Sequence, residues 1–90
     1  MPIWKIPVPF RYYTEKQPTV PVSGQTVNEA LFDLMGQYPA LKPHLCKKNG
    51  DLHAFVNLFI GETNIKDLQG LETPISENDE LRLVPSIAGG

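Results

Sequence analysis

The chain has 90 residues, a formal net charge of −2 and 41% hydrophobic residues, which is typical of one small domain with its own core. Its charges are scattered, without the basic cluster that marks a nucleic-acid-binding protein, and no apolar run approaches the ~18 residues of a membrane span. The single cysteine, Cys46, excludes an internal disulfide, so the sequence predicts a cytosolic protein.

Residues 3–10 alternate between two faces, which predicts a strand. One face carries four apolar side chains, Trp4, Ile6, Val8 and Phe10. Proline cannot donate to a sheet, so pairing on one side is expected to stop by about Pro7. Residues 12–18 are predicted to form a turn or irregular loop. A short second strand over residues 19–24 would end at Gly24 and complete a hairpin.

Residues 26–38 show the clearest helical pattern. Thr26 followed by Glu29 is typical of a capping box. The apolar residues then follow helical spacing and form one stripe, consisting of Val27, Ala30, Leu31, Leu34, Met35 and Tyr38. Pro39 is expected to end the helix, because it disfavours helical geometry at the preceding residue. We interpret the stripe as ordinary core.

The second half of the chain is predicted to contain two more long strands. A connector with one helical turn over residues 41–46 precedes a strand over residues 54–61. Alternation places Val56, Leu58 and Ile60 inward and Phe55, Asn57 and Phe59 outward. A tight turn then reverses the chain into Ile65, and a loop over residues 67–75 follows. In the last strand, residues 81–87, Leu81 and Leu83 point inward and Arg82 and Val84 point outward.

This order of elements predicts an α+β protein of the β-grasp, ubiquitin-like fold class. A mixed sheet of four to five strands would pack on one main helix and bury one shared core. The domain is expected to span residues 1–85, with pairing in the last strand stopping at Pro85. Residues 86–90 would then be a flexible C-terminal tail ending in Gly-Gly.

No familiar catalytic or metal-binding constellation is present in the sequence. His44 and His53 lie in no metal-ligand pattern, the acidic turn at residues 76–80 lacks the spacing of a calcium loop, and there is no phosphate-binding glycine motif. Cys46 has cationic neighbours but no recognisable base. We therefore expect no metal site and no permanently bound cofactor. The terminal Gly-Gly is the feature still to be explained, and three explanations compete: an accident of composition, a cloning scar or a functional tail.

The segment NDELRLVPSIAGG, residues 78–90, resembles the C-terminus of the ubiquitin-like sulfur carrier family. That family includes the small subunit of molybdopterin synthase and the thiamine-pathway sulfur carrier. The segments LHAFVNLFIGETNI, residues 52–65, and VPSIAGG are most similar to the carrier of a thiocarboxylate-dependent cysteine biosynthesis pathway. The likeness is good over residues 52–90; before that it rests on element order and the helix pattern.

The resemblance implies a carrier that is a co-substrate of partner enzymes and not an enzyme itself. An adenylating, E1-like enzyme would use ATP to activate the Gly90 carboxylate, and sulfur would displace AMP to leave a thiocarboxylate. Gly89 would help the tail thread into narrow active sites, because glycine lets another backbone approach closely. A pyridoxal-phosphate cysteine synthase is the expected acceptor, and a metalloprotease could release the cysteine.

The expected partner-binding residues are the outward side chains of the two long strands together with the tail, namely Phe55, Phe59, Arg82, Val84, Pro85, Ile87 and Ala88. Exposed aromatics beside an arginine are typical of binding hot spots. Neither nucleic acid nor membrane is expected as a partner. The alternatives left open are the molybdopterin synthase and thiamine-pathway roles, a ubiquitin-like protein modifier, and a passive binding module with an incidental tail.

Overall fold

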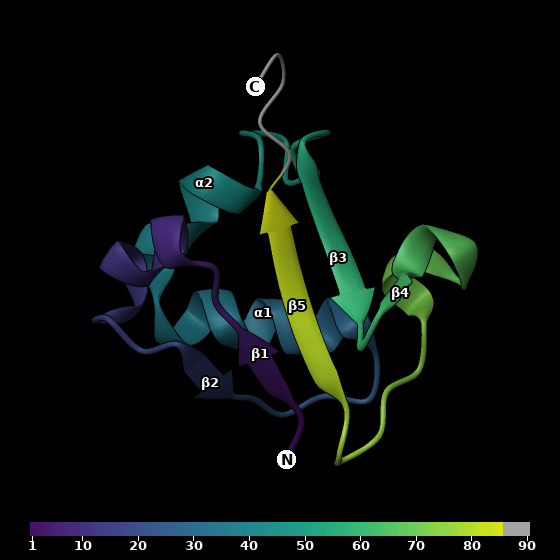
Figure 1. Cartoon of the computed structure of the whole chain (residues 1–90). Helices are drawn as coiled ribbons and strands as arrows, with labels where there is room; N and C mark the ends of the chain where they lie inside the picture. Colours follow the sequence, from purple (N-terminus) through teal and green to yellow (C-terminus); the bar gives the residue numbers. More distant parts are fainter. Residues whose placement is uncertain (86–90) are drawn as a thin grey trace.

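A mixed five-stranded sheet forms the centre of the computed structural model, which describes residues 1–85. Its strands are β1 Ile3–Lys5, β2 Thr19–Pro21, β3 Val56–Ile60, β4 Thr63–Asn64 and β5 Glu80–Pro85. They lie in the order β2-β1-β5-β3-β4, with β1 and β5 parallel and the other pairs antiparallel (Figure 1). This is the predicted β-grasp arrangement, in which the first two strands form a hairpin and the last strand lies in the middle.

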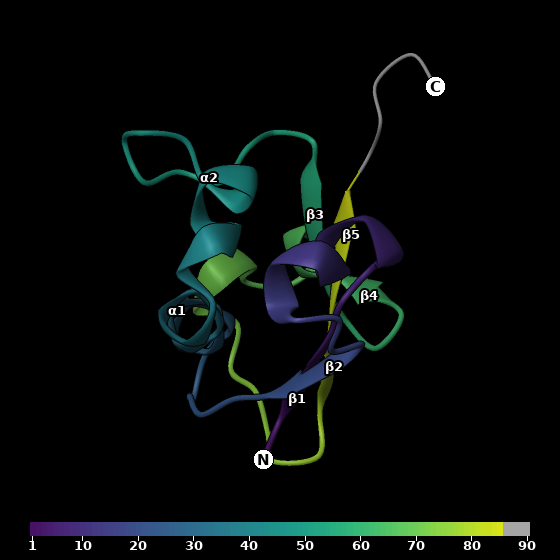
Figure 2. The same ribbon diagram turned by 90° about the vertical axis from the view of Figure 1, so that its left-hand side faces the viewer.

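Helix α1, Val27–Gln37, covers one face of the sheet (Figure 2). Its first turn is capped by Thr26, whose Oγ1 accepts a hydrogen bond from the Glu29 backbone N–H at 3.2 Å. The other half of the predicted capping box is shifted by one residue, because Glu29 Oε1 accepts from the backbone N–H of Gln25. The helix ends before Pro39, as predicted.

The core lies between α1 and the sheet. The predicted stripe is buried except for Tyr38, which is only partly buried at the end of the helix. The largest buried side chain, Trp4 of β1, also makes a polar contact across this layer: its Nε1–H donates to the Ala30 carbonyl at 2.9 Å. A buried indole N–H without a partner would be costly, so this bond fixes how β1 and α1 pack together.

The predicted strand over residues 3–10 is wrong beyond Lys5. Residues Val8–Thr14 form a 3-10 helix, η1, and the Val8 side chain is exposed instead of facing the core. Two prolines explain the difference, since they lack N–H donors for a sheet and their fixed φ suits the first turn of a helix. Ile6 and Phe10 nevertheless remain buried.

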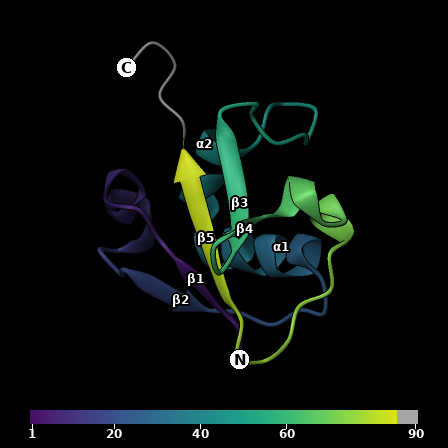
Figure 3. The ribbon, with the colours of Figure 1, turned by 45° about the vertical axis from the view of Figure 1, so that its right-hand side comes forward.

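The connecting segments contain more helical structure than the sequence predicted. The predicted turn near residues 41–46 is present as the 3-10 helix η2, Pro39–Leu41, followed by α2, Lys42–Leu45. There are two further 3-10 turns, η3 (Ile65–Asp67) and η4 (Gly70–Glu72): η4 lies within the predicted loop over residues 67–75, and η3 overlaps only its first residue. Figure 3 shows them beside β4, at the end of the sheet opposite β2. One of them is capped locally, since Asn64 Oδ1 accepts a hydrogen bond from the Lys66 backbone N–H at the start of η3.

Gly24 should be the glycine whose replacement harms the fold most. Its φ is +152°, and a Cβ at this position would lie 2.8 Å from the backbone nitrogen of Ala30 in α1. We expect Gly24→Ala to lower the free energy of unfolding by roughly 2–5 kcal/mol, through backbone strain and overpacking. Gly36→Ala is the matched control, because Gly36 is helical with nothing within 4 Å of the added Cβ; it should stabilise the chain by about 0.5–1 kcal/mol. Urea unfolding of both variants measures the difference.

Candidate docking face and adjoining groove

The sheet face opposite α1 is the candidate docking face, which we define by Phe59, Arg82 and Val84. Strand register places these side chains together: Arg82 of β5 lies opposite Phe59 of β3, and Val84 lies opposite Asn57. Arg82 is exposed, Val84 is 39% exposed and Phe59 is partly exposed. Figure 1 looks onto this face, with α1 behind the sheet. The predicted alternation of β3 and β5 is therefore correct, with Leu58, Leu81 and Leu83 buried on the other face.

Phe55 does not lie in β3, contrary to the prediction. The strand begins at Val56, and Phe55 occupies the turn just before it, where its side chain is 43% exposed. Its ring stacks on the His53 ring, with centroids 4.9 Å apart and an interplanar angle of 14°. Phe55 is thus an exposed aromatic next to the carboxyl end of β5, because Val56 pairs with Pro85.

A groove with a volume of about 310 Å³ adjoins the docking face along β5. Its lining residues come from β1, the segment after it and the second half of β5, namely Lys5, Ile6, Pro7, Arg11, Arg82, Leu83, Val84 and Pro85. The groove exists because the parallel ladder between β1 and β5 ends at the Lys5–Arg82 pair, while β5 continues to Pro85. We call it the β5 groove.

Three cations line the β5 groove, and their environments differ. Lys5 Nζ lies 3.4 Å from Glu80 Oε2, so its charge is partly balanced. The Arg11 side chain is held in place, since its Nε–H donates to the Ile6 carbonyl at 3.0 Å. Arg82 makes no ion pair within residues 1–85. Its guanidinium can therefore meet a carboxylate on a partner without first breaking an internal contact.

Five residues of the β5 groove were not predicted as site residues, namely Lys5, Ile6, Pro7, Arg11 and Leu83. The two prolines, Pro7 and Pro9, could have indicated this groove. Proline has no N–H to donate to a sheet, so the pairing ends there and the neighbouring strand is left unpaired on that side. Pro7 therefore predicts both the end of β1 and an unpaired edge along the second half of β5. Arg11 could not be assigned to the groove from the sequence, because no local sequence pattern predicted the 3-10 helix η1 that carries it.

The two histidines contact aromatic and backbone groups. The His44 ring stacks on Tyr13 of η1, with centroids 4.0 Å apart, and His53 Nε2 lies 3.1 Å from the Pro43 carbonyl oxygen. Within residues 1–85, no group of three or more His, Cys, Asp or Glu side chains could hold a metal ion. Both histidines therefore help to pack the segments around α2.

Cys46 is a buried thiol. Its Sγ lies 3.8 Å from Met35 Sδ, inside the core. Desolvation by burial raises the pKa of the Cys46 thiol; Lys42 opposes this effect and Asp51 adds to it. The cationic neighbours that the sequence suggested, Lys47 and Lys48, are not among these causes. The environment disfavours the thiolate, which is the nucleophilic form.

We expect iodoacetamide to alkylate Cys46 more slowly in the native chain at pH 7.5 than in the chain unfolded in urea. Because the folded-state pKa is raised, the stabilisation linked to this thiol is fully present below the pKa of the unfolded chain. It is then lost as the pH rises through the folded pKa. Alkylation followed by intact mass tests the first statement, and urea unfolding across pH 7–10, with Cys46→Ser as the control, tests the second. Equal alkylation rates in the folded and unfolded chains would contradict the expectation.

The predicted tail residues Ile87, Ala88, Gly89 and Gly90 lie outside the described residues, as does the predicted tail segment 86–90 as a whole. Pro85, the last described residue, is partly exposed and pairs with Val56. The described chain therefore ends at the tip of the central strand, beside the β5 groove. No helix within residues 1–85 is long and apolar enough to cross a bilayer.

Comparison with known proteins agrees with this architecture. The model of the ThiS family matches residues 4–90. The sulfur carrier protein CysO of Mycobacterium tuberculosis is 32% identical over 87 residues, which cover 94% of each chain.

Solved structures of sulfur carrier and small modifier proteins share the fold of this chain. A chain in the crystal structure of the Amycolatopsis orientalis BexX/CysO complex superposes with a TM-score of 0.89 at 29% identity and covers all of both chains. Small archaeal modifier protein 1 from Methanosarcina acetivorans has a TM-score of 0.90 at 32% identity, covering 99% of this chain and 95% of that one. The family match over nearly the whole sequence and the shared β-grasp fold lead to one conclusion: this chain belongs to the ThiS family.

Proposed function

We propose that this chain is a sulfur carrier for cysteine biosynthesis and that its Gly90 carboxylate is the site at which sulfur is loaded. The near-full-length likeness to CysO, at 32% identity over 94% of each chain, carries the proposal. The sequence adds the terminal Gly-Gly, and the fold adds a central strand, β5, whose last residue is Pro85.

The chemistry starts from a group that is unreactive on its own. A carboxylate is anionic and has no good leaving group, so one Gly90 oxygen must first attack the α-phosphorus of ATP and release pyrophosphate. A sulfur nucleophile then attacks the carbonyl carbon of the acyl-adenylate, and the bond to AMP breaks. The product is a thiocarboxylate, and the chain acts throughout as a co-substrate. ATP, magnesium and charge stabilisation belong to the adenylating enzyme.

The domain's own contribution is docking and reach. Phe59, Arg82 and Val84 would contact the adenylating enzyme, with Phe55 at the edge of the contact. The five residues after Pro85 can span roughly 16–18 Å when extended. The tail would thereby present the terminal carboxylate to an active site beyond the docked domain. The acceptor of the sulfur would be a pyridoxal-phosphate cysteine synthase, with a metalloprotease releasing the finished cysteine.

Intact-mass measurement tests the loading step. The chain is incubated with its adenylating enzyme, ATP and sulfide, and we expect one oxygen to be replaced by one sulfur at Gly90. An unchanged mass would contradict the proposal. A ladder of conjugates on denaturing gels would indicate a protein modifier instead. Co-purification identifies the acceptor: a large molybdopterin synthase subunit or a thiazole synthase in place of a cysteine synthase would contradict the cysteine role.

A further inference from the structure

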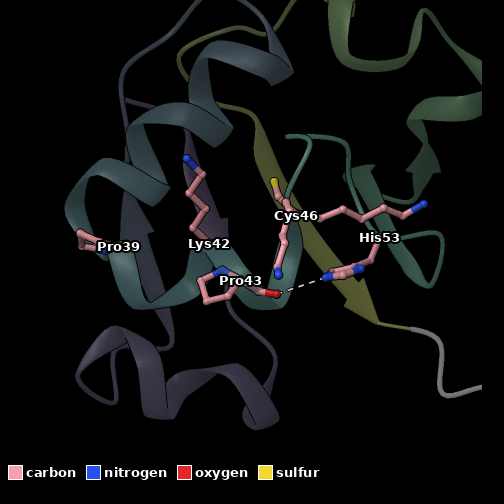
Figure 4. A pocket seen from close by; sticks show the side chains of 7 residues that line it. Pro39, Lys42, Pro43, Cys46 and His53 are labelled. Carbon is pink, nitrogen blue, oxygen red and sulfur yellow. Dashed lines mark hydrogen bonds between the residues drawn. The ribbon is translucent and has the colours of Figure 1, made fainter.

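A second concave site lies around α2, and one of its lining residues, His53, stacks on Phe55. Its volume is about 470 Å³. It is lined by two prolines, Pro39 and Pro43, by Cys46 and His53, and by three lysines, Lys42, Lys47 and Lys48. Figure 4 shows the row of side chains from Pro39 to His53, with the hydrogen bond between His53 and the Pro43 carbonyl. We call this site the α2 pocket.

The backbone around the α2 pocket is held in place by hydrogen bonds. Cys46 and Leu52 form an antiparallel bridge, and the His53 N–H donates to the Leu45 carbonyl at 2.9 Å. Lys47 donates its N–H to the Asp51 carbonyl and accepts from Gly50, which closes a tight turn that carries Lys47 and Lys48. A site built in this way needs little ordering when it binds, and that favours affinity.

The charge around the α2 pocket is opposite to that of the rest of the chain. Residues 39–53 contain three lysines and one aspartate, a formal charge of +2, whereas the remaining residues contain five cations and nine carboxylates, a charge of −4. Asp51, the local exception, does not line the pocket, and its carboxylate accepts from the Asn49 side-chain amide at 3.2 Å. None of the three lysines makes an ion pair within the described chain.

We propose that the α2 pocket is a second docking site, which binds an acidic segment of a partner protein carrying at least one apolar side chain. The exposed lysines would meet the carboxylates, while the prolines and the apolar lysine stems would contact the apolar side chain. A protein segment fits better than a nucleic acid, because the positive charge covers one small concavity and the chain around it is acidic. The site is independent of the Gly90 chemistry.

A titration followed by amide chemical shifts tests this proposal on the full ¹⁵N-labelled chain. The probe is the capped peptide Glu-Leu-Glu-Leu-Glu, and Gln-Leu-Gln-Leu-Gln is the uncharged control. We expect the acidic peptide to shift the amides of Lys42, Cys46, Lys47, Lys48 and His53. Its Kd should rise with added salt, because exposed charges are screened. The measurement needs neither ATP nor a partner enzyme, so it can fail while sulfur loading succeeds, and the reverse.

Paired variants separate the site from charge in general. Lys47→Glu/Lys48→Glu should weaken binding of the acidic peptide at least about tenfold, a loss of ~1.4 kcal/mol. Lys16→Glu/Lys66→Glu changes the net charge equally at exposed residues elsewhere and should leave the Kd within about twofold. Equal losses in both variants, equal binding of the Gln peptide, or tighter binding of inorganic phosphate or oligothymidylate would each overturn the proposal.

Discussion

Removing Gly90 should reduce the rate of thiocarboxylate formation at least about 100-fold, with no loss of folding stability. The deletion leaves a carboxylate on Gly89, but its carbon lies about 3.3–3.6 Å short of the original position along an extended tail. Misplacing a reacting group by even 1 Å can cost about 100-fold in rate. The measurement is a time course of intact mass with the adenylating enzyme, ATP and sulfide.

Two controls distinguish a missing reactive group from a damaged protein. The deletion variant should bind the adenylating enzyme as tightly as the natural chain and compete with it, because the docking face is intact. Gly90→Ala, which keeps the length but adds a Cβ, should load at an intermediate rate, since a narrow active site tolerates side chains poorly. Loading of the deletion variant at the natural rate would show that the terminal carboxylate position is not critical.

The periodic elements of this fold could be predicted from the sequence. Alternation in residues 56–60 and 81–84 correctly gave the buried and exposed faces of β3 and β5, and the α1 stripe gave the core side of the helix. In each case several side chains point in one direction, so one burial constraint fixes them all. The order of elements then allowed only a few topologies.

The irregular elements could not be predicted in the same way. Residues 3–10 also alternate, yet the two prolines turned the chain into η1 after Lys5. Such a segment stays extended only where a neighbouring strand pairs with its N–H groups. That pairing is part of the tertiary structure and cannot be predicted from the local sequence. The β5 groove is lined partly by the segment after β1, and the α2 pocket is lined by the connector between α1 and β3, so both depend on irregular segments. The strands of the docking face were therefore predictable, while the β5 groove and the α2 pocket were not.

Arg82→Glu should weaken binding to the adenylating enzyme by about 30-fold or more, the effect typical of a hot-spot residue. Arg82 lies at the centre of the docking face: it is opposite Phe59 on one side, beside Lys5 on the other, and it lines the β5 groove. It makes no internal ion pair in residues 1–85. Reversing its charge would therefore remove the proposed contact to the partner and add repulsion against any carboxylate that Arg82 would meet.

The fold should tolerate this change, because the Arg82 side chain points away from the core. Lys66→Glu is the matched control: it makes the same change in charge at an exposed residue in η3 that is not one of the docking-face residues. Calorimetric titration against the adenylating enzyme should show a large loss for Arg82→Glu and little for Lys66→Glu. If both variants bound equally well, the partner would not use the centre of the sheet. A contact confined to the tail would then be the better explanation, and the affinity should disappear when residues 86–90 are removed.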